Sequence, residues 1–165
     1  MIIGSKEFVS ISKWPKHDET KIDLKLEAQE DLVEKVVYDI KAIIELTKIN
    51  PKKVQIFVSA PWKYVFYRKL KEQIKHTRIV LELIEKTKDN DHMDQIPKLI
   101  QDALKDQSKI PEIVLDQETE IYALTLHKHI ISSRLGLEIE ILKEQDSSNP
   151  KAKSALASKP AILLL

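Results

Sequence analysis

The chain has 165 residues, of which 42% are hydrophobic and 32% charged, and its formal net charge is +1. This length and composition fit one ordinary domain that can bury a hydrophobic core without needing cross-links. The lack of cysteine excludes disulfides, thiolate metal sites and a cysteine nucleophile. No apolar run approaches the roughly 18 residues that span a membrane, and no signal-peptide pattern opens the chain, so we expect a soluble, cytoplasmic protein with no membrane partner.

The longest predicted helix runs from Ala28 to Lys48, because apolar residues recur there at spacings of three and four. These residues are Leu32, Val33, Val36, Val37, Ile40, Ile43 and Ile44. Pro51 forces a turn after this helix, since it lacks an N–H and disfavours helix at the preceding residue. The β-branched and aromatic segment VQIFVS then predicts a strand from Val54 to Ser59.

The next predicted helix begins at Pro61, where the missing N–H does no harm, and ends near His76. Its two sides differ in character. One side is expected to pack against the core and carries Trp62, Phe66, Leu70 and Ile74. The opposite stripe is expected to face water or a ligand and carries Tyr64, Arg68, Lys71 and Lys75.

Three more helical segments are predicted downstream. They span residues 78–87, 92–104 and 117–135. Pro97 should lie in the first turn of the second segment or kink it. Gly136 should stop the third by adopting the left-handed conformation that commonly caps helices.

Two strands complete the predicted fold. The segment LEIEIL alternates strictly, with Leu137, Ile139 and Ile141 expected to point inward. Residues 146–159 are polar, small and basic, so we expect a mobile loop that the structure does not need. The apolar residues 161–165 invite aggregation unless they pair as a strand. The fold class is therefore α/β: a small sheet of about three strands packed against several helices, with the first two strands paired in parallel.

Cations are concentrated in two segments that are candidates for binding phosphates. Residues 61–78 hold six Lys or Arg against the single Glu72, and the stripe of the second helix belongs to this segment. The loop near the C-terminus contributes Lys151, Lys153 and Lys159. Exposed lysines are usually only solvated, so the residues alone favour a plain surface in both segments.

Other chemistry finds little support in the sequence. His127 and His129 would point to opposite sides of a helix, which excludes a shared metal ion and leaves no metal site. Gly4 and Gly136 cannot form a phosphate-cradling glycine loop. No serine or acid stands in a recognisable triad context, so no catalytic residue is assigned.

Several strings in the sequence are similar to a known family. SISKWPKHDETKID resembles the segment that closes the helical anticodon-binding bundle of the class I synthetases for leucine, isoleucine and valine. The strings LVEKVVYDIKAIIELTKINPKKVQIFVSAPWK, LHKHIISSRLGLEIEIL and KPAILLL look like the C-terminal domain of archaeal and eukaryotic-type leucyl-tRNA synthetases. The resemblance covers nearly the whole chain, and it implies that residues 1–25 are a linker from a missing helical bundle and that residues 26–165 form the C-terminal α/β domain.

The resemblance implies a role in protein biosynthesis. In this family the C-terminal domain helps to bind tRNA(Leu), chiefly at its long variable arm, so tRNA(Leu) and the rest of the synthetase chain are the expected partners, and DNA is not. The HIGH and KMSKS signatures of the catalytic domain do not occur in this sequence. The ligase reaction, with its ATP and Mg²⁺, therefore belongs to the parent enzyme, and this chain is expected to need no cofactor and to be inactive alone.

Two alternatives stay open at this point. Residues 79–120 hold eleven acidic side chains against five lysines, so the acidic stretch from Glu82 to Glu120 is a candidate docking surface of a protein-interaction module in a synthetase complex. The second alternative is a diverged, free-standing paralogue without a tRNA role, because the tail ALASKPAI lacks the extra proline and some of the basic residues usual in the family.

Overall fold

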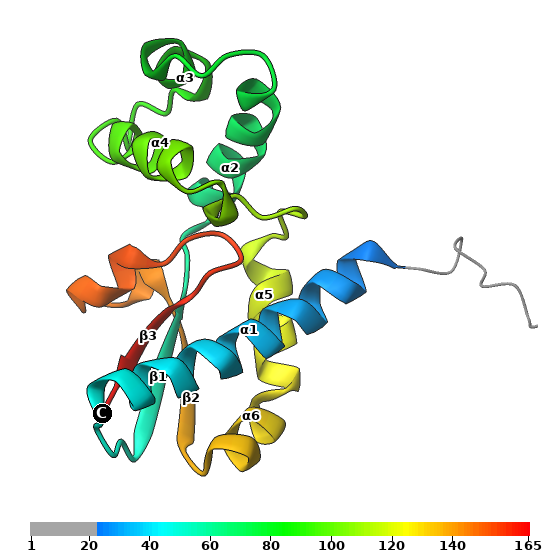
Figure 1. Cartoon of the computed structure of the whole chain (residues 1–165), viewed down its shortest axis with the longest axis vertical. Helices are drawn as coiled ribbons and strands as arrows, with labels where there is room; N and C mark the ends of the chain where they lie inside the picture. Colours follow the sequence, from blue (N-terminus) through cyan, green and yellow to red (C-terminus); the bar gives the residue numbers. More distant parts are fainter. Residues whose placement is uncertain (1–22) are drawn as a thin grey trace, which may run out of the picture.

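A computed structural model describes residues 23–165 (Figure 1). The linker prediction for residues 1–25, and with it the SISKWPKHDETKID motif, lies almost entirely outside the described residues. The described helices and strands are α1 (Leu24–Thr47), β1 (Lys53–Val58), α2 (Pro61–Ile74), α3 (Val80–Thr87), α4 (Ile96–Lys105), α5 (Gln117–Leu126), α6 (Lys128–Leu135), β2 (Glu138–Lys143) and β3 (Ala161–Leu164). This arrangement confirms the predicted α/β class.

The three strands form a mixed sheet in the order β2-β1-β3. β1 pairs in parallel with β2, Val54 opposite Ile139, and antiparallel with β3, Ile56 opposite Ile162. The predicted parallel pair and the predicted terminal strand are both confirmed. The segment from α2 to α6 connects β1 to β2, as a parallel pair requires.

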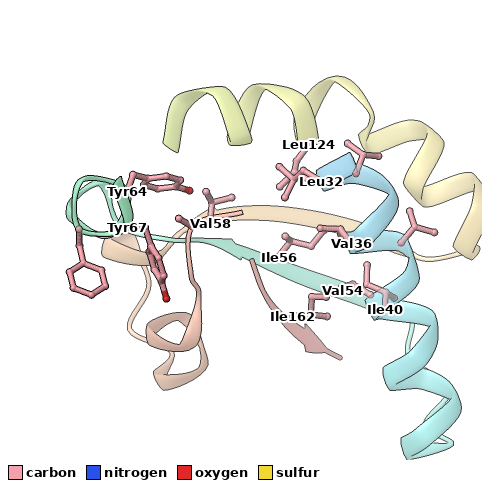
Figure 2. Packing of buried hydrophobic residues seen from close by; sticks show 14 of the residues in the cluster. Leu32, Val36, Ile40, Val54, Ile56, Val58, Tyr64, Tyr67, Leu124 and Ile162 are labelled. Atoms are coloured by element: carbon pink, nitrogen blue, oxygen red, sulfur yellow. The ribbon is translucent and has the colours of Figure 1, made fainter. Parts of the chain in front are cut away.

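Helices cover one face of this sheet and supply most of the core. Figure 2 shows α5 above the strands and α1 beside them, with Leu32, Val36 and Ile40 of α1 directed at Val54 and Ile56 of β1. All five of these side chains are buried. On the other face Phe57 packs with three small residues near the C-terminus, which are Ala152, Ala155 and Ala161. The central strand β1 is therefore enclosed from both sides.

Helices α2, α3 and α4 gather beyond one end of the strands (Figure 1). Leu70, Leu83 and Ile100, one from each helix, are fully buried and belong to the same core cluster as the sheet. Pro97 lies in the first turn of α4, as predicted. The start of α2, at Pro61, follows the end of β1 closely and therefore lies beside the end of the sheet.

Three of the predicted helices differ clearly from those of the structure. α4 begins at Ile96, four residues later than predicted, because residues 92–95 form turns instead of helix. α1 begins four residues early, because the Asp23 carboxylate accepts hydrogen bonds from the N–H groups of Lys25 and Leu26 and caps the helix. The predicted helix 117–135 is two helices that meet at His127. The Nδ1 of His127 lies 2.9 Å from the Ala123 carbonyl oxygen, the same oxygen that the His127 N–H reaches. Gly136 has φ of 68° and ends α6, as predicted.

The connection from β2 to β3, residues 144–160, is ordered, and we call it the tail. It contains two 3-10 turns, Glu144–Asp146 and Pro150–Ser154, and Leu156 and Lys159 exchange two backbone hydrogen bonds. The side chains of Ala152, Ala155 and Ala157 are buried. The prediction of a mobile, dispensable loop is therefore wrong. The sequence did not reveal this packing, because the small alanines that pack against the sheet produce no recognisable apolar period.

Candidate nucleic-acid interface

The predicted solvent stripe of α2 is only partly exposed. Tyr64 is 2% exposed, and its hydroxyl donates a 2.7 Å hydrogen bond to Oε2 of Glu120. The prediction that Tyr64 faces water or a ligand is therefore wrong. α2 packs against α3 on one side and against Glu120 of α5 on another. More of its circumference is therefore buried than the positions of its apolar residues on a helical wheel indicate.

The cations of the same stripe bind protein groups, although Arg68 and Lys75 are exposed and Lys71 is half-buried. Arg68 donates a 2.7 Å hydrogen bond to the Leu115 carbonyl, and Lys71 donates one to the Glu112 carbonyl. Lys75 forms a 3.0 Å ion pair with Glu72 on its own helix. Arg68 and Lys71 thus hold the loop that leads into α5, which gives both side chains a structural task whether or not RNA also contacts them.

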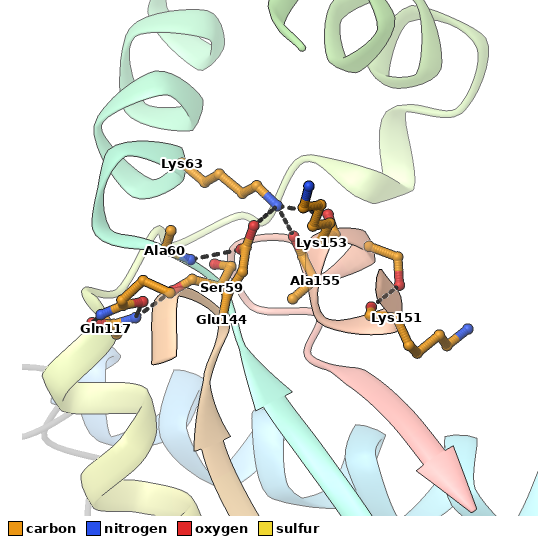
Figure 3. Close-up of polar contacts among 10 residues, drawn as sticks. Ser59, Ala60, Lys63, Gln117, Glu144, Lys151, Lys153 and Ala155 are labelled. Atoms are coloured by element: carbon orange, nitrogen blue, oxygen red, sulfur yellow. Dashed lines mark hydrogen bonds and ion pairs between the residues drawn. The ribbon is translucent and has the colours of Figure 1, made fainter. Parts of the chain in front are cut away.

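A buried lysine fastens the tail to α2. The Nζ of Lys63 lies 2.9 Å from Oε1 of Glu144 and donates hydrogen bonds of 2.9 and 2.7 Å to the carbonyls of Lys153 and Ala155 (Figure 3). The second Glu144 oxygen accepts a 2.8 Å bond from the Ala60 N–H. Burial lowers the pKa of Lys63, and the ion pair with Glu144 opposes that shift. Sequence patterns did not predict this role, since Lys63 is one of many lysines in a basic segment.

A buried carboxyl group holds the tail at a second point. Besides the Tyr64 hydroxyl, Glu120 accepts a 2.6 Å hydrogen bond from the Ser158 N–H through Oε1. Ser158 has φ of 57°, so the tail turns sharply here. Burial raises the pKa of Glu120 to about 7, although the hydrogen bond from Tyr64 lowers it. Glu120 therefore changes charge near neutral pH while it supports the tail.

This carboxyl group makes stability depend on pH. The folded-state pKa of about 7 exceeds the usual 4.5, so the folded chain holds the proton more tightly than the unfolded chain. Stability from Glu120 is complete below pH 4.5 and declines as pH rises through about 7, by up to about 3 kcal/mol. We expect this decline to disappear in Glu120→Gln, whose amide can donate to the Tyr64 oxygen and accept from Ser158.

Urea unfolding of both proteins at about pH 5 and about pH 8 measures the effect. Other carboxylates, such as Asp89 and Asp116, have lowered pKa values and also contribute to the pH dependence of stability. Their contribution cancels in the comparison, because both proteins contain them. Equal changes in unfolding free energy between the two pH values would show that Glu120 does not titrate in this range.

The anchored tail presents its three lysines to solvent. Lys151, Lys153 and Lys159 are all exposed, and none forms an ion pair with another residue of the described part of the chain. Figure 3 shows the Lys151 side chain extending away from Lys63. The alanines between these lysines point inward and pack, so the fold itself sets the outward direction of the cations.

Two of these lysines line a groove between the tail and α1. The groove consists of two adjoining hollows of about 270 and 370 Å³ that share Asp39, Lys109, Lys159 and Pro160. We call it the lysine groove, after the four cations that line it: Lys35, Lys109, Lys151 and Lys159. Asp39 is its one acidic lining residue within residues 23–165. Lys35 and Lys109 were not predicted as part of a site, because they lie far from the tail in sequence.

Three carboxylates of the acidic segment 79–120 take part in the fold itself. Asp106 caps a 3-10 turn, Asp116 caps α5, and Glu120 is fully buried. Each of these three carboxylates accepts hydrogen bonds from the protein itself. Asp106 and Asp116 nevertheless remain exposed, so of these three carboxylates only Glu120 is removed from the acidic surface.

Two further kinds of site are not found in residues 23–165. No group of three or more His, Asp or Glu side chains there is arranged to hold a metal ion. His127 is instead part of the junction between α5 and α6. No helix in this part of the chain has the length and apolar character needed to cross a membrane.

Comparison with known proteins supplies the family context. No family model matches the chain. The leucine–tRNA ligase of Methanocaldococcus jannaschii is 30% identical over 165 residues, which cover 99% of this chain and 17% of that enzyme. The homologues of this chain are archaeal leucyl-tRNA synthetases. The enzymes of Pyrococcus furiosus and Pyrococcus abyssi are 31% and 28% identical over 163 residues, covering 98% of this chain and 16% of each enzyme.

The match to leucyl-tRNA synthetases concerns one part of those enzymes. The chain spans about a sixth of the length of these relatives, at their C-terminal region. It therefore corresponds to a C-terminal synthetase domain, as the sequence resemblance implied. The lysine groove and the anchored tail are features of that domain.

Proposed function

We propose that this domain binds tRNA(Leu), chiefly the long variable arm, on behalf of a leucyl-tRNA synthetase. The observation that supports the proposal best is the tail, a folded segment whose three lysines are exposed while its backbone is fixed by Lys63 and Glu120. A fixed backbone suits phosphate binding, because less backbone freedom is lost when the RNA docks. The rest of the synthetase chain and tRNA are the proposed partners.

The lysine groove supports the same proposal on electrostatic grounds. Four lysines lie along it with a single acidic lining residue among the described side chains, so its lining carries an excess of positive charge although the whole chain is nearly neutral. The exposed Asp106 carboxylate, which interacts with Lys109 and Lys159, offsets part of that charge. Local charge of this kind attracts a polyanion and concentrates it at the surface. An RNA backbone that follows the groove passes Lys151 and Lys159 of the tail and Lys35 of α1.

Catalysis is assigned to another part of the proposed parent enzyme. The nucleotide-binding signatures are absent from this sequence, so ATP and Mg²⁺ would act in the catalytic domain. The domain described here would contribute affinity for tRNA and no reacting group. A protein-docking role through the acidic segment is the second candidate; of its carboxylates Glu120 is buried, while Asp106 and Asp116 are exposed.

Replacing Lys151, Lys153 and Lys159 together by serine tests the proposal. We expect weaker tRNA(Leu) binding and a log-log salt slope smaller by about 0.7 to 0.9 for each lysine–phosphate pair removed. The melting temperature should change little, because exposed substitutions usually alter stability by about 0.5 kcal/mol or less each. Fluorescence anisotropy with labelled tRNA gives both affinity and slope.

A matched variant shows whether tRNA affinity depends on the position of the lysines or only on the net charge of the chain. Lys86, Lys88 and Lys98 are exposed residues in and after α3 and in α4, so their triple serine variant loses the same charge elsewhere. We expect it to keep most of the affinity and the slope. If both triple variants bind tRNA as the unmodified chain does, the tail does not contact RNA.

A further inference from the structure

A hollow at the start of α2 lies beside the tail, and we call it the Trp62 hollow. Its volume is about 520 Å³, within the roughly 300–1,000 Å³ typical of small-molecule sites. The rings of Trp62 and His92 stack in its wall, with centroids 4.1 Å apart and planes 12° from parallel. Lys153 of the tail lines the same hollow. None of the features described above uses this pair of rings.

The two rings are held in place from several sides. The Nδ1 of His92 lies 3.2 Å from Oδ2 of Asp89. Trp62 meets Phe66 at a ring distance of 6.3 Å, and the Nζ of Lys63 lies 5.8 Å from the centre of the Trp62 ring. The pair is nevertheless open to solvent in part, since the His92 side chain is 28% exposed. A fixed, partly exposed pair of planar rings is a surface on which another planar ring can stack.

Polar groups around the hollow differ in their availability. Glu144 and Gln145 are already bonded, to Lys63 and Gln117 respectively. The Gln95 side chain makes no hydrogen bond to another residue within 23–165, and it can both donate and accept. The Ser147 hydroxyl accepts from the Asn149 N–H and keeps its own proton to donate. The hollow thus combines a stacking surface, two hydrogen-bonding side chains and one cation.

We propose that the Trp62 hollow binds one unpaired nucleobase of an RNA strand. The base stacks on the Trp62–His92 pair, its edge meets Gln95 and Ser147, and Lys153 neutralises an adjacent phosphate. Unpaired bases are recognised in this way, by aromatic side chains together with hydrogen bonds to the base edge. The cation favours a nucleotide over an aromatic side chain of a protein. This inference rests on the proposed function for its class of ligand.

The test uses fluorescence, because the chain has only two tryptophans. In Trp14→Phe, Trp62 is the sole tryptophan. We expect single-stranded hexauridylate and hexaadenylate to quench its fluorescence, and a fully paired RNA duplex of the same length not to do so. Measured by fluorescence anisotropy with labelled RNA, Trp62→Ala should weaken binding of the single strands by about 5- to 150-fold, the loss typical for one base–aromatic stack, and should leave duplex binding unchanged.

A second variant keeps the test valid if Trp62→Ala fails to fold. Gln95→Ala leaves the rings in place and should weaken binding of single strands while leaving the circular dichroism spectrum and the melting curve unchanged. Absence of quenching by either oligonucleotide would overturn the inference, and so would quenching only by a phenylalanine-containing peptide. If the triple serine variant of the tail weakens tRNA binding while Trp62 fluorescence does not respond, this inference alone fails and the proposed function stands.

Discussion

Lys63→Met is expected to lower the free energy of unfolding by about 3–5 kcal/mol, the usual cost of breaking a buried ion pair from one side. Lys63 is 1% exposed and its ammonium serves three oxygen atoms. Methionine fills a similar volume but leaves the Glu144 carboxylate without its cation and two tail carbonyls without a donor. Urea unfolding followed by circular dichroism measures the loss.

Two comparisons show whether the loss comes from the buried pair. Lys69→Met removes a lysine that is exposed on the same helix and should change stability by about 0.5 kcal/mol or less. Adding Glu144→Gln to Lys63→Met removes the stranded charge and keeps an acceptor for the Ala60 N–H, so it should restore part of the loss. A Lys63→Met protein as stable as Lys69→Met would show that the ion pair does not hold the tail.

Deleting residues 161–165 is expected to abolish cooperative unfolding of the domain. The deletion removes β3 and Ile162, which is 7% exposed, and opens one edge of the central strand β1. It also removes the Leu165 carbonyl that accepts hydrogen bonds from the Lys52 and Lys53 N–H groups. Thermal denaturation of the truncated chain measures the result.

Point variants in β3 separate packing from chain length. Ile162→Ala should cost about 2–5 kcal/mol, as buried large-to-small changes do. Leu165→Ala should cost far less, because the Leu165 side chain is 55% exposed and its backbone bonds are kept. A truncated chain that melts within about 3 °C of the full chain, equivalent to about 1 kcal/mol, would contradict the role of β3.

The regular elements of the fold were largely predictable from sequence. In α1 the apolar residues recur at helical spacing, and in β1 the β-branched residues form a short run. Both patterns are local in sequence, and the same residues are the ones that the fold buries. The terminal apolar residues predicted β3 because an unpaired apolar end is costly. What failed was the assignment of exposure on α2, where Tyr64 contacts Glu120, a residue 56 positions away. A helical wheel carries no information about such a partner.

The candidate site was predictable only in part. The tail lysines stood out as cations near the C-terminus, but the alanines that pack beneath them give no apolar signal. Lys35 and Lys109 join the lysine groove because α1 and the loop after α4 meet the tail only in the folded chain. The stacked pair of Trp62 and His92 likewise brings together residues 30 positions apart. In each case the missing information is three-dimensional proximity.

The central claim, binding of tRNA(Leu) through lysines on the anchored tail, is tested most directly by a salt titration. Affinity for tRNA(Leu) and for a tRNA with a short variable arm is measured at several salt concentrations with the unmodified chain. We predict tighter binding of tRNA(Leu) and a steep log-log decline with salt, about 0.7 to 0.9 for each phosphate contact. Equal, weak binding of both tRNAs, with little dependence on salt, would contradict the claim.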